Sequence, residues 1–340
     1  MSARRPWAWP LVPVYAAVVR VKERLRRAGV LKVQRLEWPV VSVGSISAGG
    51  AGKTPVVMAL AEMLKSCGWD VDVLSRGYGR VEEGVEQVAA LGDKAAERYG
   101  DEPVLIARQT GVPVWVGGDR IAAGRAAEKG AERGAHRVHL LDDGFQHRQL
   151  ARNFDVVLLT AEDLDDTLMP AGNLREGFDA LLWADAVVVR EDELDAVKAR
   201  AWKLMREGAQ MWVVRRRLEF PAPLFVFGAG LRPVAFCAIA RPEGFQTMLR
   251  EAGCGVVETI AFADHCAYGM RDMERIVEVG RRLNATGFVT TEKDSVKLTA
   301  TMRERLETLG PLMVVGLKAE FADGDAVMNA LGARLGARNA

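Results

Sequence analysis

Cysteine is scarce in this sequence, and no apolar run is long enough to cross a membrane as a helix. The apolar, uncharged residues 7–19 are flanked by arginines and fall short of the roughly 20 residues that a spanning helix needs. No small-residue cleavage site follows them to suggest a signal peptide. The cysteines show neither a C-x-x-C pair nor metal-ligand spacing, so we interpret them as reduced thiols of a cytosolic protein. They are Cys67, Cys237, Cys254 and Cys266.

A large excess of charge of either sign is also missing. The formal net charge is +1 over 340 residues, which argues against broad nucleic-acid binding, and we expect no nucleic-acid partner. Hydrophobic residues make up 49% of the chain, which excludes a disordered protein and indicates a globular one. A chain of this length can bury one large core or two ordinary ones, and two α/β domains are the natural expectation.

Basic residues gather at the N-terminus, where residues 1–36 contain nine Lys or Arg residues and a single acid, Glu23. Beyond Pro13 the spacing predicts a helix with one apolar and one basic face. Such a helix, with tryptophans near its start, would lie in a membrane interface. It could equally pack on the protein's own core, and the sequence alone leaves both interpretations open. The apolar face comprises Val14, Val18, Val21 and Leu25, and the basic face Arg20, Arg24 and Arg27.

A glycine-rich loop between a predicted strand and a predicted helix organises the chain. Residues 40–43 predict a buried strand, and a helical pattern begins at Pro55. Glycines let backbone N–H groups turn inward around a phosphate, and the helix N-terminus favours the anion. Lys53 would then reach the β- and γ-phosphates of ATP, and Thr54 would bind Mg²⁺. The strict pattern has glycine where this chain has Ser47, so the alternative is a plain glycine-rich turn. The expected nucleotide-binding residues are Ser47, Ala48, Gly49, Gly50, Ala51, Gly52, Lys53 and Thr54.

Polar clusters follow other predicted elements of the same region. Residues 138–141 predict a strand that ends in Asp142 and Asp143, and an acid in this position is the usual Mg²⁺ partner of a phosphate loop. Adjacent aspartates repel one another unless a cation or hydrogen-bond donors offset their charge. Arg175 and Glu176 lie in an irregular loop. They form either a surface ion pair or an active-site feature in which the arginine stabilises phosphoryl-transfer charge.

Asp101 and His265 are candidate functional residues. Asp101 precedes a predicted helix, so it is either the helix N-cap or a carboxylate at the mouth of a site. His265 follows Asp264 beyond a predicted strand at residues 256–260, near the sheet edge where α/β proteins bind ligands. A lone histidine is more often structural, but the neighbouring acid at this edge favours a functional role.

Apolar strands alternate with helices along the chain, which predicts a P-loop-type doubly wound parallel sheet and a second, smaller α/β domain. Charge and prolines interrupt the alternation at residues 215–223 and indicate a domain boundary. This boundary places Asp101 and His265 on different domains. The expected segments are an N-terminal helix (1–36), a nucleotide-binding domain (37–215), a linker (216–226), a second α/β domain (227–318) and a C-terminal tail or helix (319–340).

Eight short segments, in this order, resemble one family, the tetraacyldisaccharide 4'-kinases of Gram-negative bacteria. The segments are SISAGGAGKTP, SRGYGR, GDEP, LDDGFQH, PAGNLREG, FCAIARP, FADHCAY and TTEKDSVKL. The resemblance covers nearly the whole chain, and the family also carries a small hydroxyl residue at the position of Ser47. The family commonly has a second histidine where this chain has Cys266, which leaves His265 as the only candidate histidine there.

The resemblance implies transfer of the ATP γ-phosphate to the 4'-hydroxyl of tetraacyldisaccharide 1-phosphate, which gives lipid IV(A). It implies two α/β/α domains joined by a short β linker, with the active site in the cleft. We expect ATP and Mg²⁺ as cofactors, a glycolipid substrate, a monomer, and peripheral contact with anionic membrane at the cytoplasmic face of the bacterial inner membrane. The implied site residues are Asp101 paired with His265 as the catalytic base, Lys53 and Arg175 in charge stabilisation, and Thr54, Asp142, Asp143 and Glu176 at the metal.

Other functions fit parts of the pattern. A membrane-associated partitioning ATPase has a similar loop, but Ser47 occupies roughly the place of its signature lysine. A GTPase selects its base with Asn-Lys-x-Asp, whereas here Lys293 directly precedes Asp294. A non-enzymatic nucleotide-sensing scaffold has no use for an acid–histidine pair.

Overall fold

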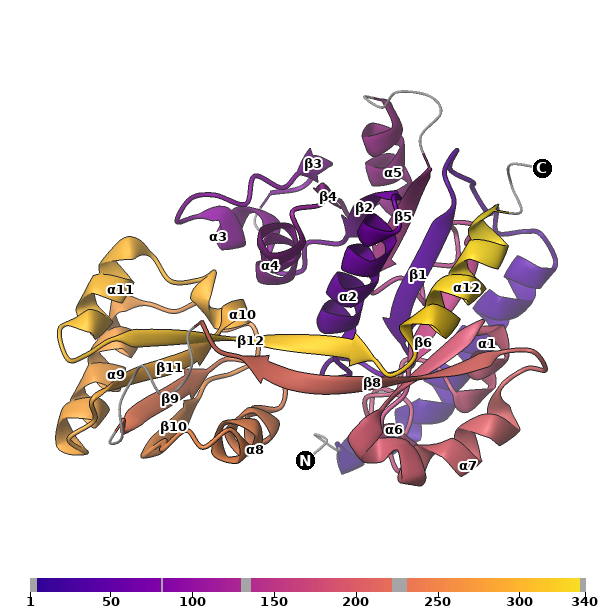
Figure 1. Ribbon diagram of the computed structural model, residues 1–340. Helices are drawn as coiled ribbons and strands as arrows, with labels where there is room; N and C mark the ends of the chain where they lie inside the picture. The colour runs from indigo at the N-terminus through magenta and orange to yellow at the C-terminus, as the bar shows by residue number, and fades with distance from the viewer. Residues whose placement is uncertain (1–4, 81, 130–135, 222–230, 337–340) are drawn as a thin grey trace. The chain divides into compact units, whose positions relative to one another are not determined.

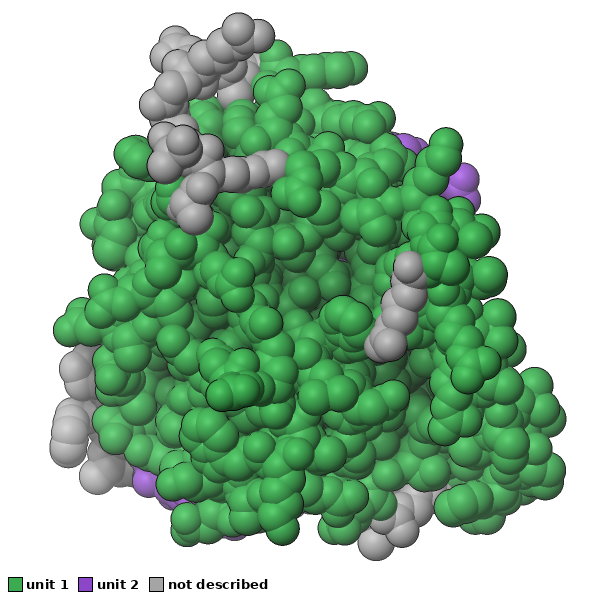
Figure 2. Space-filling model, turned by 90° about the vertical axis from the view of Figure 1, so that its right-hand side faces the viewer, with its two compact units in different colours: residues 1–76, 117–215, 319–340 green, residues 77–116, 216–318 purple. Residues whose placement is uncertain are grey.

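The structure is a computed structural model that describes residues 5–80, 82–129, 136–221 and 231–336 (Figure 1). The chain divides into two compact units, which Figure 2 distinguishes by colour. Unit 1 comprises Met1–Arg76, Gly117–Arg215 and Ala319–Ala340, and unit 2 comprises Gly77–Val116 and Arg216–Lys318.

Unit 1 is built on a parallel sheet in which the strand order is β8-β7-β6-β1-β5-β2. The central strand β1 is buried at every residue and pairs with β5 on one side and β6 on the other. Strands buried on both faces read as continuous apolar runs, which is why residues 40–43 and 138–141 predict strands. The strands are β1 (Val40–Ser45), β2 (Asp70–Ser75), β5 (Arg137–Asp142), β6 (Phe154–Leu158), β7 (Ala186–Arg190) and β8 (Gln210–Glu219).

Helices surround this sheet and bury apolar residues against it. Helix α2 buries Val57, Leu60 and Leu64, and the C-terminal helix α12 packs on α2, where Gly324 faces Met63. A second cluster, which includes Val187 on β7, fills the space beneath α7. The helices are η1 (Pro6–Leu11), α1 (Val12–Arg27), α2 (Lys53–Ser66), α5 (Arg120–Lys129), α6 (Ala161–Leu164), η2 (Phe178–Trp183), η3 (Glu191–Glu193), α7 (Leu194–Leu204) and α12 (Gly324–Leu335).

Unit 2 is built on the parallel strands β10-β9-β11-β12, with apolar clusters on both faces. A short antiparallel pair, β3 and β4, belongs to the same unit. Its strands are β3 (Glu86–Gln87), β4 (Val114–Val116), β9 (Pro233–Cys237), β10 (Glu258–Ala261), β11 (Gly287–Thr291) and β12 (Leu312–Phe321), whose last three residues belong to unit 1. Its helices are α3 (Ala95–Tyr99), α4 (Asp101–Thr110), α8 (Pro242–Glu251), α9 (Met270–Arg282), α10 (Glu292–Ser295) and α11 (Ala300–Glu307).

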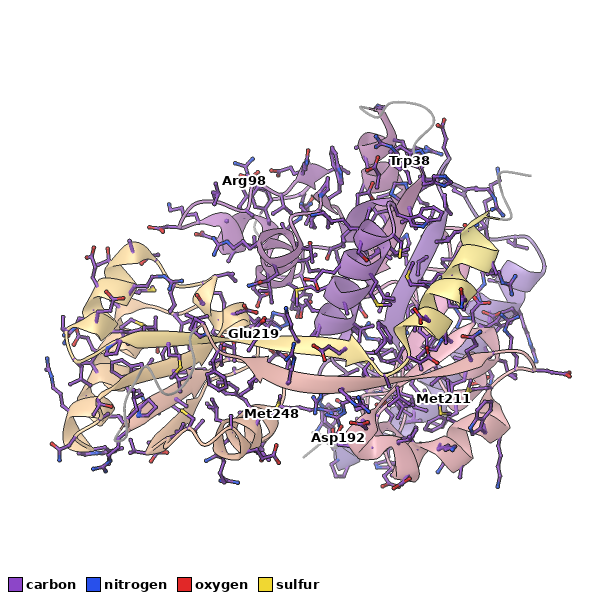
Figure 3. The ribbon with its side chains drawn as sticks, viewed as in Figure 1. Trp38, Arg98, Asp192, Met211, Glu219 and Met248 are labelled. Atoms are coloured by element: carbon purple, nitrogen blue, oxygen red, sulfur yellow. The ribbon has the colours of Figure 1, made fainter. Side chains whose placement is uncertain are left out.

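The units differ from the contiguous domains that the sequence suggested. Residues 77–116 belong to unit 2, because α3, α4 and β4 share an apolar cluster with Val296. Asp101 and His265 therefore lie in the same unit and not on different ones. Part of the expected linker is strand, since β8 continues to Glu219 (labelled in Figure 3), whereas residues 222–226 lie outside the described part. The C-terminal segment forms α12 of unit 1.

The N-terminal helix α1 is attached to unit 1 by one side only. Ala16 is buried, and the Tyr15 hydroxyl donates a hydrogen bond to the backbone oxygen of Arg175. The expected apolar face points away from the protein, because Val14 and Val18 are each 61% exposed. Trp7 in η1 is 76% exposed. No described helix combines the length and the apolar character that crossing a bilayer requires.

Candidate active site

The glycine-rich loop joins β1 to α2 in unit 1, as the sequence predicted. Gly49, Gly50 and Gly52 have φ values of 72°, 69° and 85°, in the left-handed region that glycine adopts readily. Gly52 is the N-cap of α2, and Lys53 is its first residue. The helix thus begins two residues before the predicted Pro55. Its free N–H groups and dipole make this terminus a site that favours an anion such as phosphate.

Lys53 and two other charged residues meet at the start of α2. The Lys53 ammonium lies 3.4 Å from Oδ1 of Asp143, and Arg175 donates a hydrogen bond of 2.8 Å to Oδ2 of the same carboxylate. Burial would raise the pKa of Asp143, but the charges of Lys53 and Arg175 outweigh it and lower that pKa. Asp143 is therefore a carboxylate at neutral pH, and it holds two cations beside the phosphate-type loop.

Gln146 connects this charged group to β1, although the sequence alone had not singled it out. It accepts a hydrogen bond from Arg175 at 3.2 Å and donates one of 2.8 Å to the backbone oxygen of Ser45. The signal was its place in the segment LDDGFQH, only three residues beyond Asp143.

The two aspartates lie at the carboxyl end of β5. Asp142 is buried and accepts a hydrogen bond of 2.9 Å from the Ser75 hydroxyl at the end of β2. Asp143 follows with φ of 48°, a strained value for a residue with a side chain. The turn packs tightly on β1, because a Cβ added at Gly44 would lie 2.5 Å from that of Phe145. Glycine at position 44 thus lets the acidic turn approach the strand that leads into the loop.

Glu176 is placed differently from the two aspartates. Its carboxylate is ion-paired with Arg148, which also binds Glu23 of α1 at 3.2 Å. Burial raises the pKa of Glu176, and Arg148 offsets only part of that effect. Among the described residues, no group of three or more histidine, cysteine, aspartate or glutamate side chains is arranged to hold a metal ion. Glu176 therefore does not form one carboxylate cluster with Asp142 and Asp143.

Asp101 and His265 meet in unit 2. Nδ1 of His265 lies 2.9 Å from Oδ2 and 3.1 Å from Oδ1 of Asp101, which is the first residue of α4 and not its N-cap. Burial would raise the pKa of Asp101, but the hydrogen bond from His265 and the charge of Lys293 lower it. The hydrogen bond to Asp101 raises the pKa of His265, against burial and Lys293. The pair is a buried carboxylate beside an imidazole, which can accept a proton from an alcohol.

Lys293 and Tyr78 also lie beside Asp101 and His265, although the sequence did not indicate a function for either. Lys293 contacts His265, Glu102 and Asp264, and the ring of Tyr78 lies 5.2 Å from that of His265. The segments SRGYGR and TTEKDSVKL, which contain Tyr78 and Lys293, were the available signals.

Comparison with known proteins places these residues in a family. The family model of tetraacyldisaccharide-1-P 4'-kinase matches residues 4–336 of the chain. The chain belongs to that family. The tetraacyldisaccharide 4'-kinase of Koribacter versatilis is 40% identical over 327 residues, which cover 94% of this chain and 96% of the relative. That of Stenotrophomonas maltophilia is 39% identical and covers 87% and 85%, respectively. A crystal structure of LpxK from Aquifex aeolicus in complex with ATP matches with a TM-score of 0.75 and 29% identity, and covers 97% of this chain and 99% of that one.

This membership agrees with the expected fold class and with the resemblance seen in the sequence. The described residues form a mixed α/β structure with a large parallel sheet, and this structure matches that of LpxK.

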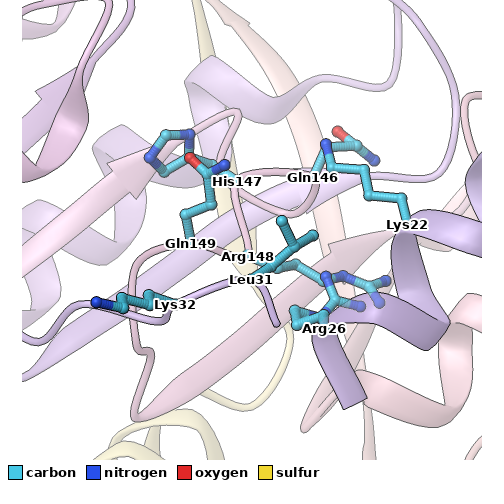
Figure 4. Close-up of a pocket in the computed structure, with 8 residues that line it drawn as sticks. All are labelled: Lys22, Arg26, Leu31, Lys32, Gln146, His147, Arg148 and Gln149. Carbon is cyan, nitrogen blue, oxygen red and sulfur yellow. The ribbon is translucent and has the colours of Figure 1, made fainter. Parts of the chain in front are cut away.

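A pocket of about 70 Å³ lies beside α1 in this kinase (Figure 4). Its two lysines, Lys22 and Lys32, form no ion pair with any residue that the structure describes. Burial lowers the pKa of His147 to about 4, so this ring is neutral at physiological pH. The pocket therefore offers cations and neutral hydrogen-bonding groups. The lining residues are Lys22, Arg26, Leu31, Lys32, Gln146, His147, Arg148 and Gln149.

Proposed function

We propose that this chain transfers the γ-phosphate of ATP to the 4'-hydroxyl of tetraacyldisaccharide 1-phosphate, which gives lipid IV(A). The observation that carries the proposal is the arrangement at the start of α2. A loop with three left-handed glycines leads into a free helix N-terminus, and Lys53 and Arg175 flank it. Phosphoryl transfer needs positive charge placed where negative charge develops, more than it needs covalent chemistry.

The phosphates of ATP would bind to the backbone of the loop and to two cations. Residues 47–52 supply N–H groups to the phosphate oxygens, and Lys53 neutralises charge on the β- and γ-phosphates. Arg175 stabilises the transferring group, since Asp143 and Gln146 already hold its guanidinium in place. Neither role requires the Lys53 or Arg175 side chain to move from its position in the structure.

The acidic residues also suit a Mg²⁺ ion, which prefers oxygen ligands and keeps several of its sites for water and substrate phosphates. Thr54, Asp142 and Asp143 offer a hydroxyl and two carboxylates, and such a set needs no third protein carboxylate. Mg²⁺ would supply charge neutralisation at the phosphates when bound. Glu176, held by Arg148, would then act by ordering the loop that carries Arg175 rather than by binding the metal.

The acceptor hydroxyl would lose its proton to Asp101. The lowered pKa of Asp101 makes this carboxylate a weak base in the resting protein. The carboxylate is nevertheless ionised, so it can accept the hydroxyl proton as the P–O bond forms. His265 donates a hydrogen bond to it and fixes its orientation. A general base of this kind contributes on the order of 10²- to 10⁴-fold to rate.

Helix α1 and η1 would bind the protein to an anionic membrane, at the cytoplasmic face of the bacterial inner membrane. The exposed apolar residues are flanked by lysines and arginines, the composition of an interfacial helix. The Tyr15 and Glu23 contacts tie this helix to the loop of Arg175 and to Arg148. Membrane binding would thereby bring a glycolipid substrate to the site.

The pocket beside α1 would receive the 1-phosphate of the glycolipid. The family's substrate carries a phosphate at that position, and Lys22 and Lys32 provide charge that no acid of the described part neutralises. Removing one such contact should raise the KM for glycolipid and leave the KM for ATP unchanged.

The test is transfer of label from [γ-³²P]ATP to purified tetraacyldisaccharide 1-phosphate in detergent micelles. We expect a labelled lipid product that requires ATP and Mg²⁺ and that disappears in Lys53→Ala. ATP hydrolysis without a labelled lipid would contradict the proposal and would favour a membrane-associated ATPase.

A further inference from the structure

Lys293 lies on α10 with its ammonium group among three acceptors. Its Nζ is 2.9 Å from Oε1 of Glu102, 3.3 Å from Nε2 of His265 and 3.5 Å from Oδ1 of Asp264. An ammonium group has three N–H donors and no acceptor. Each donor therefore has one of these three atoms within reach. Burial disfavours the charge, but the neighbouring acids outweigh it and raise the pKa of Lys293, so it stays charged.

This contact fixes the hydrogen on the imidazole ring of His265. Because Lys293 can only donate, Nε2 must accept, and an Nε2 that accepts carries no hydrogen. The single hydrogen of the neutral ring is then on Nδ1, which faces both oxygens of Asp101. Asp264 opposes this arrangement, since its Oδ2 lies 3.8 Å from Nε2 and would favour an N–H there. Lys293 is nearer to Nε2 than Asp264 is, and it also offsets the charge of Asp264.

The position of Lys293 is set by buried polar contacts of the preceding strand and turn. Helix α10 begins at the N-cap Thr291, whose hydroxyl bonds with Asp294. Asp294 has no exposed surface, and its carboxylate accepts the backbone N–H of Ala238 on the chain beyond β9. These contacts hold the backbone that carries Lys293, and the contacts of its ammonium group with Glu102, His265 and Asp264 hold the side chain.

We propose that Lys293 is a positioning residue that holds His265 as the neutral Nδ1–H tautomer, so that the imidazole always donates to Asp101. The proposal rests on the proposed function of Asp101 as the proton acceptor. Oδ1 of Asp101 accepts the backbone N–H of Glu102 at 2.9 Å in addition to facing Nδ1 of His265, whereas Oδ2 faces Nδ1 alone among the described residues and so keeps a lone pair for the hydroxyl proton. Without Lys293, the ring could turn its N–H toward Asp264 or take a second proton at Nε2.

The charged and titratable groups that face His265 give the direction of the pH effect. Asp101 faces it from α4, Lys293 from α10, Asp264 from its own turn, and the Tyr78 ring packs beside it. Of these groups only Lys293 opposes a positive charge on the ring, an effect that it shares with burial of the ring. In Lys293→Met, His265 should therefore take up its second proton at a higher pH, and the acidic limb of kcat should move to higher pH. At neutral pH kcat should fall about 10-fold, part of the full effect of a general base, with the KM for ATP unchanged.

The experiment combines that pH profile with ¹⁵N NMR of histidine-labelled full-length protein. His265→Gln assigns the His265 signals, and long-range ¹H–¹⁵N couplings distinguish the tautomers. We expect the Nδ1–H pattern in the wild type and in Lys293→Arg, which keeps an N–H donor, and loss of that pattern in Lys293→Met. Lys318→Met is the matched control, because Lys318 pairs with Glu219 on the surface and does not contact His265.

An unchanged Nδ1–H pattern in folded Lys293→Met would overturn the proposal, as would a loss of kcat that is the same at every pH. The NMR result is independent of catalysis. If Asp101→Ala proved fully active while Lys293→Met lost the tautomer, the role of Asp101 as the base would fail and the assignment of Lys293 would stand. If Asp101→Ala were inactive and the tautomer persisted in Lys293→Met, the reverse would hold.

Discussion

His139 lies on β5 with no exposed surface, and a carboxylate faces each of its ring nitrogens. Nδ1 is 2.5 Å from Asp72 of β2, Nε2 is 3.4 Å from Glu128 of α5, and the ring stacks on Trp38 (labelled in Figure 3) at 4.9 Å between centroids. Only the doubly protonated imidazolium can donate to both acids. Burial lowers the pKa of His139, but the two carboxylates outweigh it and raise the pKa from 6.5 to about 9.

A pKa that is higher in the folded than in the unfolded chain adds stability at low pH. The contribution is fully present below the unfolded value of 6.5 and is lost as the pH rises through about 9. At 1.36 kcal/mol per pKa unit, the shift corresponds to about 3 kcal/mol of the free energy of unfolding. That is a large part of the stability of an ordinary domain.

The assay is urea unfolding of the wild type and of His139→Gln at about pH 6 and about pH 10, with free energies from linear extrapolation. A glutamine side chain cannot carry charge, so the variant should be less stable by several kcal/mol at the lower pH. The difference between the two proteins should shrink by about 3 kcal/mol at the higher pH. A difference that stays constant across this range would refute the charged, doubly bonded state of His139.

The site and the N-terminal helix give four further predictions. Lys53→Ala should keep its fold but lose about 10²-fold or more in kcat, as measured by label transfer, and near-normal turnover would remove the loop from the mechanism. Asp101→Ala and His265→Ala should each lower kcat and leave ATP binding intact, and the double variant should be little worse than the worse single one, because residues that act as a unit are not additive. Deleting residues 1–27 should release the protein from phosphatidylglycerol vesicles in a sedimentation assay; continued sedimentation would place the membrane contact elsewhere. Lys32→Gln should raise the KM for glycolipid but not for ATP in steady-state kinetics, and equal effects on both would exclude the pocket as a phosphate subsite.

The parts of unit 1 that the sequence predicted are those with strong local signals. Strand β1 is continuously apolar, and the loop after it needs glycines, so residues 40–66 could be assigned before the structure was known. The acids of the turn after β5 followed from the same reasoning. The sequence did not predict strand β8. Its second half is the charged run Arg215, Arg216 and Arg217, and partly exposed strands at this position resemble a linker in sequence.

Contacts between distant segments account for most of what the sequence could not show. Residues 77–116 join unit 2 through the Val296 cluster and through the pairs Lys293–Glu102 and Gln109–Glu292, and no local pattern encodes these. The family resemblance implied that Asp101 pairs with His265, but their 2.9 Å contact follows from the placement of α4 and is not encoded locally. The sequence also could not predict the ion pairs of Arg148 with Glu23 and Glu176, because these residues come from three separate segments.

The position of the transferred phosphate tests the central claim most directly. The glycolipid product of the full-length protein, made with ATP and Mg²⁺, would be analysed by two-dimensional ¹H–³¹P correlation NMR. We predict one new phosphomonoester that correlates with the proton on the 4' carbon, beside the phosphate already present at position 1. A new phosphate correlated with any other sugar proton, or ATP consumption with no new lipid phosphate, would contradict the account.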